Sequence, residues 1–144
     1  MTVSTEIGTC TQADMDKALE YVRGVLPYNS MCPTGSVYTN GVGNDCDVLV
    51  YGAKEDLIPL RAAGFVRCSA TEYGDATSSD WTAIRLGSIN VLLCYCPELY
   101  KRWKSAAEVC RWLGHTTKAQ RIVLHEMIKN CVDMEVALER ATIS

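Results

Sequence analysis

Residues 45–51 read Asp-Cys-Asp-Val-Leu-Val-Tyr, and the apolar, β-branched run from Cys46 to Tyr51 predicts a buried strand. Asp45 and Asp47 stand at the polar start of this strand, separated by one residue. Side chains two positions apart in a strand point to the same face. We therefore expect both carboxylates to emerge together at the edge of a sheet, where solvent and ligand meet.

Two carboxylates this close repel each other unless a positive charge lies between them. A hard divalent cation prefers carboxylate and phosphate oxygens, so Asp45 and Asp47 predict a site for Mg²⁺ or Mn²⁺. A pair of such ions can hold the attacking and leaving oxygens of a phosphoryl transfer. The alternative is a polar turn in which Asp45 acts as a cap and Asp47 is solvated.

Gly35-Ser36 lies shortly upstream of the acidic pair. A glycine lets the backbone approach a ligand closely. A serine hydroxyl, together with free N–H groups at the start of a following helix, can hold a phosphate. Gly35 and Ser36 are therefore candidate nucleotide-binding residues, and the two motifs together are more specific than either alone.

The pattern outward from this stretch predicts an α/β (α+β) fold, with a small mixed β-sheet flanked by helices. Thr11 and Asp14 have the spacing of a capping box for the first helix, and Pro27 ends that helix. Helices are expected at Thr11–Leu26, Glu55–Ala63 with a late start or kink at Pro59, Pro97–Leu113, and from Thr116 or Thr117 to about Leu138. Strands are expected at Cys46–Tyr51, Phe65–Ala70, Trp81–Arg85 and Ile89–Cys96, with a brief one possible within 28–34, a hairpin turn at 86–88 and a loop at 71–80.

The totals fit one globular domain over residues 1–144. The chain has 144 residues with 48% hydrophobic and 22% charged residues, which argues against disorder. Its net charge of −3 gives no global positive field toward nucleic acid or membrane. The eight cysteines sit in apolar runs, and no signal peptide or membrane span is apparent, so we expect reduced thiols and a cytoplasmic protein without membrane contact.

Gly35-Ser36 followed by Asp45-Cys46-Asp47-Val48-Leu49-Val50 resembles the signature of the polymerase-beta-type nucleotidyltransferase superfamily. The stretches Arg85–Leu93, Tyr100–Trp103 and Lys118–Leu124 resemble small nucleotidyltransferase-like proteins encoded by tailed bacteriophages. The resemblance spans roughly residues 12 to 128. It implies a nucleotidyltransferase fold in the cytoplasm of a host cell, with Asp45 and Asp47 binding metal and Gly35 and Ser36 holding a nucleoside triphosphate. It also implies transfer of a nucleoside monophosphate to a hydroxyl of a nucleic acid end, a protein or a small molecule.

The chain departs from this pattern in two ways. The gap between Ser36 and Asp45 is short, so the intervening helix must be clipped. Asn90 stands where the superfamily has a third carboxylate, and an amide oxygen can contact a cation but brings no negative charge and cannot act as a base. Asn90 is therefore a candidate catalytic position that has changed chemistry, and Asp80 is a candidate substitute for the missing acid.

Lys118 and Arg121 lie three residues apart and share a helix face, which predicts either a clamp on the nucleotide phosphates or a solvated charged face. Three functions follow from these patterns. The first is a metal-dependent nucleotidyltransferase. The second is a catalytically degenerate protein of the same fold that binds and inhibits a host protein, for example in a defence system. The third is an accessory particle protein without a small-molecule site.

Overall fold

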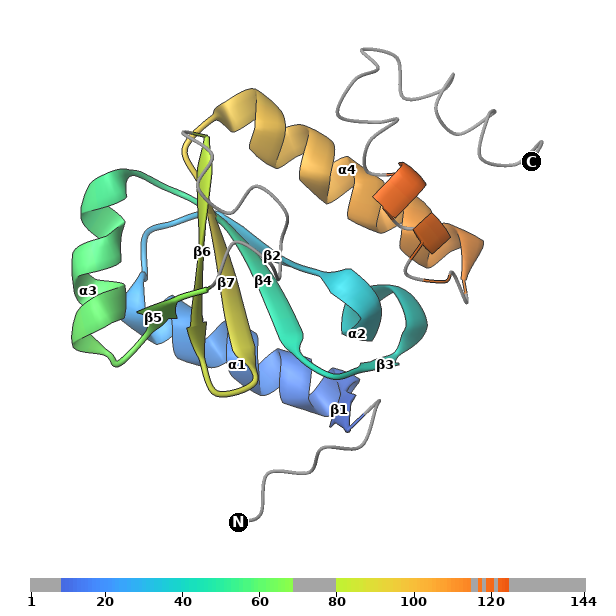
Figure 1. The fold of residues 1–144 in the computed structure, drawn as a ribbon, viewed down its shortest axis with the longest axis horizontal. Helices are drawn as coiled ribbons and strands as arrows, with labels where there is room; N and C mark the ends of the chain where they lie inside the picture. Colours follow the sequence, from blue (N-terminus) through green and yellow to red (C-terminus); the bar gives the residue numbers. More distant parts are fainter. Residues whose placement is uncertain (1–8, 69–79, 115–116, 118, 121, 125–144) are drawn as a thin grey trace.

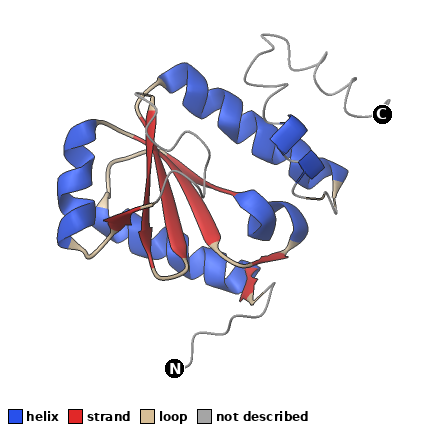
Figure 2. Ribbon diagram, in the orientation of Figure 1, coloured by secondary structure: helices blue, strands red, loops and turns tan. Residues whose placement is uncertain are grey.

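The computed structural model describes residues 9–68, 80–114, 117, 119–120 and 122–124. Its helices surround a twisted sheet, as Figure 1 and Figure 2 show. The strands are β1 (Cys10–Thr11), β2 (Met31–Thr34), β3 (Val42–Gly43), β4 (Cys46–Tyr51), β5 (Val66–Arg67), β6 (Trp81–Leu86) and β7 (Ile89–Cys94). The helices are α1 (Gln12–Val25), α2 (Gly35–Asn40), α3 (Leu57–Ala62) with a preceding 3₁₀ turn (Lys54–Asp56), and α4 (Pro97–Leu113).

The main sheet has five strands in the order β2-β4-β7-β6-β5. The central pair β4 and β7 is parallel, and the other neighbours are antiparallel. A second, two-stranded sheet joins β1 to β3. The predicted mixed sheet flanked by helices is therefore confirmed, and the acidic strand β4 lies inside the sheet with a neighbour on each side.

The two faces of the main sheet bury different side chains, because successive residues of a strand point to opposite faces. Cys46, Val48 and Val50 of β4 face α1 and belong to one apolar cluster with Met15 and Val22. Leu49 of β4 faces α4 and belongs to a second cluster. That second cluster also contains Leu92, Trp81 and Trp103, and the two tryptophan rings meet edge to face with centroids 5.5 Å apart.

The first helix begins as its sequence predicts. The Thr11 hydroxyl accepts a hydrogen bond from the Asp14 N–H, and the Asp14 carboxylate accepts one from the Thr11 N–H. These hydrogen bonds hold the pKa of Asp14 below its ordinary value. The helix ends at Val25, just before Leu26 and Pro27.

Other boundaries agree in part with the prediction. The hairpin forms with a two-residue turn at Gly87-Ser88, where Gly87 has a φ of 58°, and β7 ends at Cys94 rather than at Cys96. Pro59 lies in the first turn of α3, so the late helix start is confirmed. The predicted strand over 65–70 forms pairs at Val66 and Arg67. The predicted loop at 71–79 lies outside the described residues, as does most of the predicted last helix, of which residues 119–120 and 122–124 are helical.

The cysteines in the described part of the chain are free thiols, and most of them are buried. Cys131 lies outside that part. The described helices include none that is both long and apolar enough to cross a membrane.

Candidate functional site

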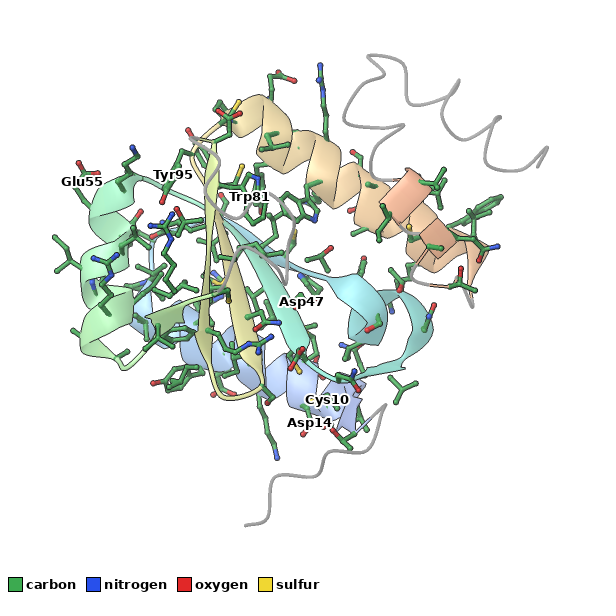
Figure 3. The ribbon with its side chains drawn as sticks, in the orientation of Figure 1. Cys10, Asp14, Asp47, Glu55, Trp81 and Tyr95 are labelled. Atoms are coloured by element: carbon green, nitrogen blue, oxygen red, sulfur yellow. The ribbon has the colours of Figure 1, made fainter. Side chains whose placement is uncertain are left out.

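A row of four polar side chains crosses the sheet at the start of β4. Thr34 of β2 is paired with Asp47 of β4, Asp47 with Asn90 of β7, and Asn90 with Arg85 of β6. Residues paired across adjacent strands point to the same face, so all four lie on the face that α4 covers. Figure 3 shows Asp47 on β4 beside α2, with Trp81 further along the sheet toward α4. This polar row joins residues from four separate strands.

Asn90 is the centre of the row. Its side chain is 1% exposed, and its Nδ2 donates a hydrogen bond of 2.9 Å to Asp47 Oδ1. Its Oδ1 accepts a hydrogen bond of 2.6 Å from Arg85 Nε. Because an amide has one donor side and one acceptor side, the carboxylate and the guanidinium together fix the orientation of this side chain. The predicted third ligand position therefore directs its N–H group, not its oxygen, toward Asp47.

Asp45 lies in a bend just before β4, so it is next to the strand rather than on it. Its Oδ2 is 3.5 Å from Arg85 Nη2, and both side chains are about one-third exposed (35% and 31%). The guanidinium thus touches Asn90 on one side and Asp45 on the other. Among the described residues, two carboxylates and one guanidinium give this cluster one net negative charge.

The Gly35-Ser36 turn and the acidic strand form one packed unit. Gly35 has a φ of 78°, a left-handed conformation that side chains rarely adopt, and a Cβ at this position would overlap the Asp47 carboxylate. A Cβ at Gly43 would likewise overlap the Ser36 hydroxyl. The Thr39 hydroxyl donates a 3.0 Å hydrogen bond to the Gly35 carbonyl, which fixes this turn of α2. The predicted motif residues Gly35, Ser36 and Asp47 are therefore brought together.

The hydroxyl of Thr34 has an unusual environment. Thr34 is 2% exposed, and its Oγ1 is the buried side-chain polar atom without a hydrogen-bond partner among the described residues. A buried hydroxyl without a partner costs about 1–3 kcal/mol, so such a group is a candidate for contact with a bound ligand. Thr34 stands directly opposite Asp47, so its side chain lies on the same face of the sheet as the Asp47 carboxylate.

Two carboxylates and a buried hydroxyl suit a cation such as Mg²⁺, which proteins commonly hold through one or two carboxylates plus phosphate oxygens. Asn90 does not complete the set, because its oxygen already accepts from Arg85. Within residues 9–68 and 80–114, no group of three or more His, Cys, Asp or Glu side chains converges on a metal position. Asp45 and Asp47 are therefore the residues of this set with the carboxylate oxygens that such a cation takes.

Asp80 does not replace the third carboxylate. Its carbonyl accepts a hydrogen bond from the Tyr95 N–H. Tyr95 follows the last residue of β7, whereas Asn90 is near the first. Tyr95 lies five positions after Asn90, which is roughly 16 Å at the usual rise of a strand. The idea of Asp80 as a substitute acid is wrong. Lys118 and Arg121 lie outside the described residues, so the phosphate clamp stays a prediction.

Sequence reasoning gave no role to Arg85 or Thr34. The signal for Arg85 was present in the hairpin, because counting outward from the two-residue turn Gly87-Ser88 pairs Leu86 with Ile89 and then Arg85 with Asn90. For Thr34 there was no comparable signal, since its neighbour across the sheet depends on how β2 and β4 align.

Cys46 lies between the two aspartates in sequence but faces away from them. Burial raises its pKa to about 12, and the neighbouring Cys10 thiol adds to this shift. It is therefore a neutral thiol at physiological pH and not a nucleophile. A shallow depression of about 330 Å³ lies on the same side, lined by α1 and the β6–β7 turn, away from the polar row.

Comparison with known proteins gives no further assignment. The chain matches no family model, and no curated protein is significantly similar to it.

Proposed function

We propose that this chain is a metal-dependent nucleotidyltransferase that acts at the edge formed by Asp45, Asp47 and the Gly35-Ser36 turn. One observation carries the proposal: the Gly35 backbone packs so closely on the Asp47 carboxylate that no side chain fits between them. A solvated polar turn does not require this contact. The resemblance of the same residues to the superfamily signature gives the reaction class.

In this proposal Asp45 and Asp47 would hold a divalent cation, whose chemistry there would be to offset the negative charge of the substrate triphosphate. The Ser36 hydroxyl and nearby backbone N–H groups orient the phosphates. Attack of an acceptor hydroxyl on the α-phosphorus forms the new P–O bond, and the bond to the β-phosphate oxygen breaks to release pyrophosphate. Because the Asn90 amide cannot take a proton, the two aspartates are the groups of the described site able to receive the hydroxyl proton.

The experiment is thermal unfolding with each ribonucleoside and deoxyribonucleoside triphosphate, with and without Mn²⁺ or Mg²⁺. A ligand at 100 times its Kd stabilises by about 2.7 kcal/mol, which raises the Tm of a domain of this size by several degrees. We expect a shift that requires the metal and is lost in the double variant Asp45→Asn/Asp47→Asn.

The matched control is Asp16→Asn/Glu20→Gln, which removes two negative charges from the exposed face of α1. It should keep the full metal-dependent shift. A wild-type chain that shows no shift with any triphosphate and metal would rule out the proposal.

A second candidate is favoured by the Arg85–Asn90–Asp47 hydrogen bonds, which put an amide and a cationic side chain where a third carboxylate is expected. This candidate is a catalytically degenerate domain that binds and inhibits a host protein. If this candidate is correct, the Asp45→Asn/Asp47→Asn variant should have the same effect on a bacterial host that produces it as the wild-type chain has. Loss of that effect in a folded double variant would exclude this candidate.

A further inference from the structure

Arg85 supplies a positive charge at the acidic pair. Its guanidinium is anchored at one end, where Nε donates 2.6 Å to the buried Asn90 oxygen. The other end makes a looser contact, 3.5 Å from Nη2 to Asp45 Oδ2, between two side chains that are each about one-third exposed (31% and 35%). Exposed ion pairs contribute little to stability, so the contact with Asp45 is weaker than the hydrogen bond to Asn90.

We propose that Arg85 is a built-in counter-ion that competes with a divalent cation for Asp45, and that it exchanges Asp45 for a phosphate once a metal–nucleotide complex binds. This inference rests on the proposed function, because it concerns the same site. No covalent step is involved: one ion pair is replaced by another.

The geometry allows this exchange. Nε is anchored to the buried Asn90 side chain, so the guanidinium can stay at the site while its Nη groups turn away from Asp45. A planar guanidinium offers several N–H donors in a fork that fits phosphate oxygens. The buried Thr34 hydroxyl, which has no partner, stands on the same sheet face opposite Asp47 and gives the incoming cation or phosphate a further oxygen contact.

The proposal makes two predictions of opposite sign for Arg85→Met. Without nucleotide, removal of the competing charge should tighten Mn²⁺ binding by up to about fivefold, the range that a partly exposed ion pair allows. With a triphosphate that carries a methylene bridge between its α and β phosphorus atoms, the same variant should bind the Mn²⁺–nucleotide complex about tenfold or more weakly. If Arg85 had a purely structural role, Arg85→Met would weaken both Mn²⁺ binding without nucleotide and binding of the Mn²⁺–nucleotide complex.

The measurement is free Mn²⁺ by electron paramagnetic resonance, on the full chain, with circular dichroism to check folding. The matched control is Arg67→Met. Arg67 is exposed on β5 and is paired with Ile84, whose side chain packs in the cluster under α1, on the sheet face opposite to that of Arg85. It should bind like the wild type in both experiments.

The outcomes separate this inference from the proposed function. Equal or weaker Mn²⁺ binding by Arg85→Met, with measurable binding by the wild type, overturns the counter-ion role and leaves the metal site in place. Absence of Mn²⁺ binding in every variant, with or without nucleotide, overturns both.

A second measurement covers the case in which Arg85→Met does not fold. The Nε–H signal of Arg85 in the wild-type chain is assigned by its loss in Arg85→Lys and is followed by NMR during a Mg²⁺ titration. We expect it to persist and to shift with the midpoint of Mg²⁺ binding. If other signals in the spectrum shift as Mg²⁺ binds while the Arg85 Nε–H signal does not, the exchange is overturned.

Discussion

Gly35 is the residue on which the candidate site most depends. Its backbone has a φ of 78° and lies against the Asp47 carboxylate, so two separate constraints require a glycine at this position. The sequence identified the Gly-Ser and Asp-x-Asp motifs because both consist of neighbouring residues. It did not identify Thr34, since nothing local marks a threonine that will stand opposite an aspartate with its hydroxyl unpaired.

Gly35→Ala should lower the free energy of unfolding by more than about 2 kcal/mol, from backbone strain plus the displaced hydrogen bond between Asn90 and Asp47. Urea unfolding measures this. Gly87→Ala also places a side chain at a positive φ (58°), but no atom lies within 4 Å of the added Cβ, so it should cost only about 1 kcal/mol. Equal losses for the two variants would mean that the contact with Asp47 adds nothing.

At the scale of elements, the caps and turns made the boundaries predictable. Thr11 with Asp14, Pro97 at the start of α4, and the two-residue turn at Gly87-Ser88 are local signals, and each marks a boundary that the structure shows. The helix α2 came only from the resemblance, because six residues carry too little periodicity to reveal a helix. It is held by contacts with α4, including Arg111 over the Tyr38 ring at 4.6 Å.

Thr11→Ala should lower the free energy of unfolding by about 1 kcal/mol, because the Asp14 N–H loses its acceptor and α1 loses its capping box. Thr11→Ser retains the hydroxyl and should stay within a few tenths of a kcal/mol of the wild type. Chemical denaturation at neutral pH measures both. Equal stability of Thr11→Ala and Thr11→Ser would show that the capping box of Thr11 and Asp14 does not stabilise the protein.

At the scale of the whole molecule, the parallel pairing of β4 with β7 could not be read from the sequence. Asp47 and Asn90 are separated by 43 residues, and no local signal states that their strands become neighbours. The apolar run over residues 46–51 predicted a buried strand. It did not predict which of the two clusters, under α1 or under α4, would receive each of its side chains.

The buried thiols predict a loss of stability at alkaline pH. Burial raises the pKa of Cys46 from 9.0 to about 12, so the unfolded chain gives up this proton first. The stabilising contribution is complete below pH 9 and is lost as the pH rises toward 12. Urea unfolding from pH 7 to 10.5 under reducing conditions should show a falling free energy, with a smaller slope in Cys46→Ala. The half-buried Cys96→Ala is the control, and identical slopes in the two variants would contradict this assignment.

The polar row also has a consequence for how the chain folds. The row crosses the junction between two antiparallel pairs, β2 with β4 and β6 with β7, which meet only through the parallel contact of β4 and β7. A slip of β7 by one residue would place Ile89 or Val91 opposite Asp47, and would leave a carboxylate facing hydrocarbon while Asn90 and Arg85 moved away together. The same side chains that form the candidate site therefore also favour one register between the two halves of the sheet, because a slipped register loses the hydrogen bond from Asn90 to Asp47.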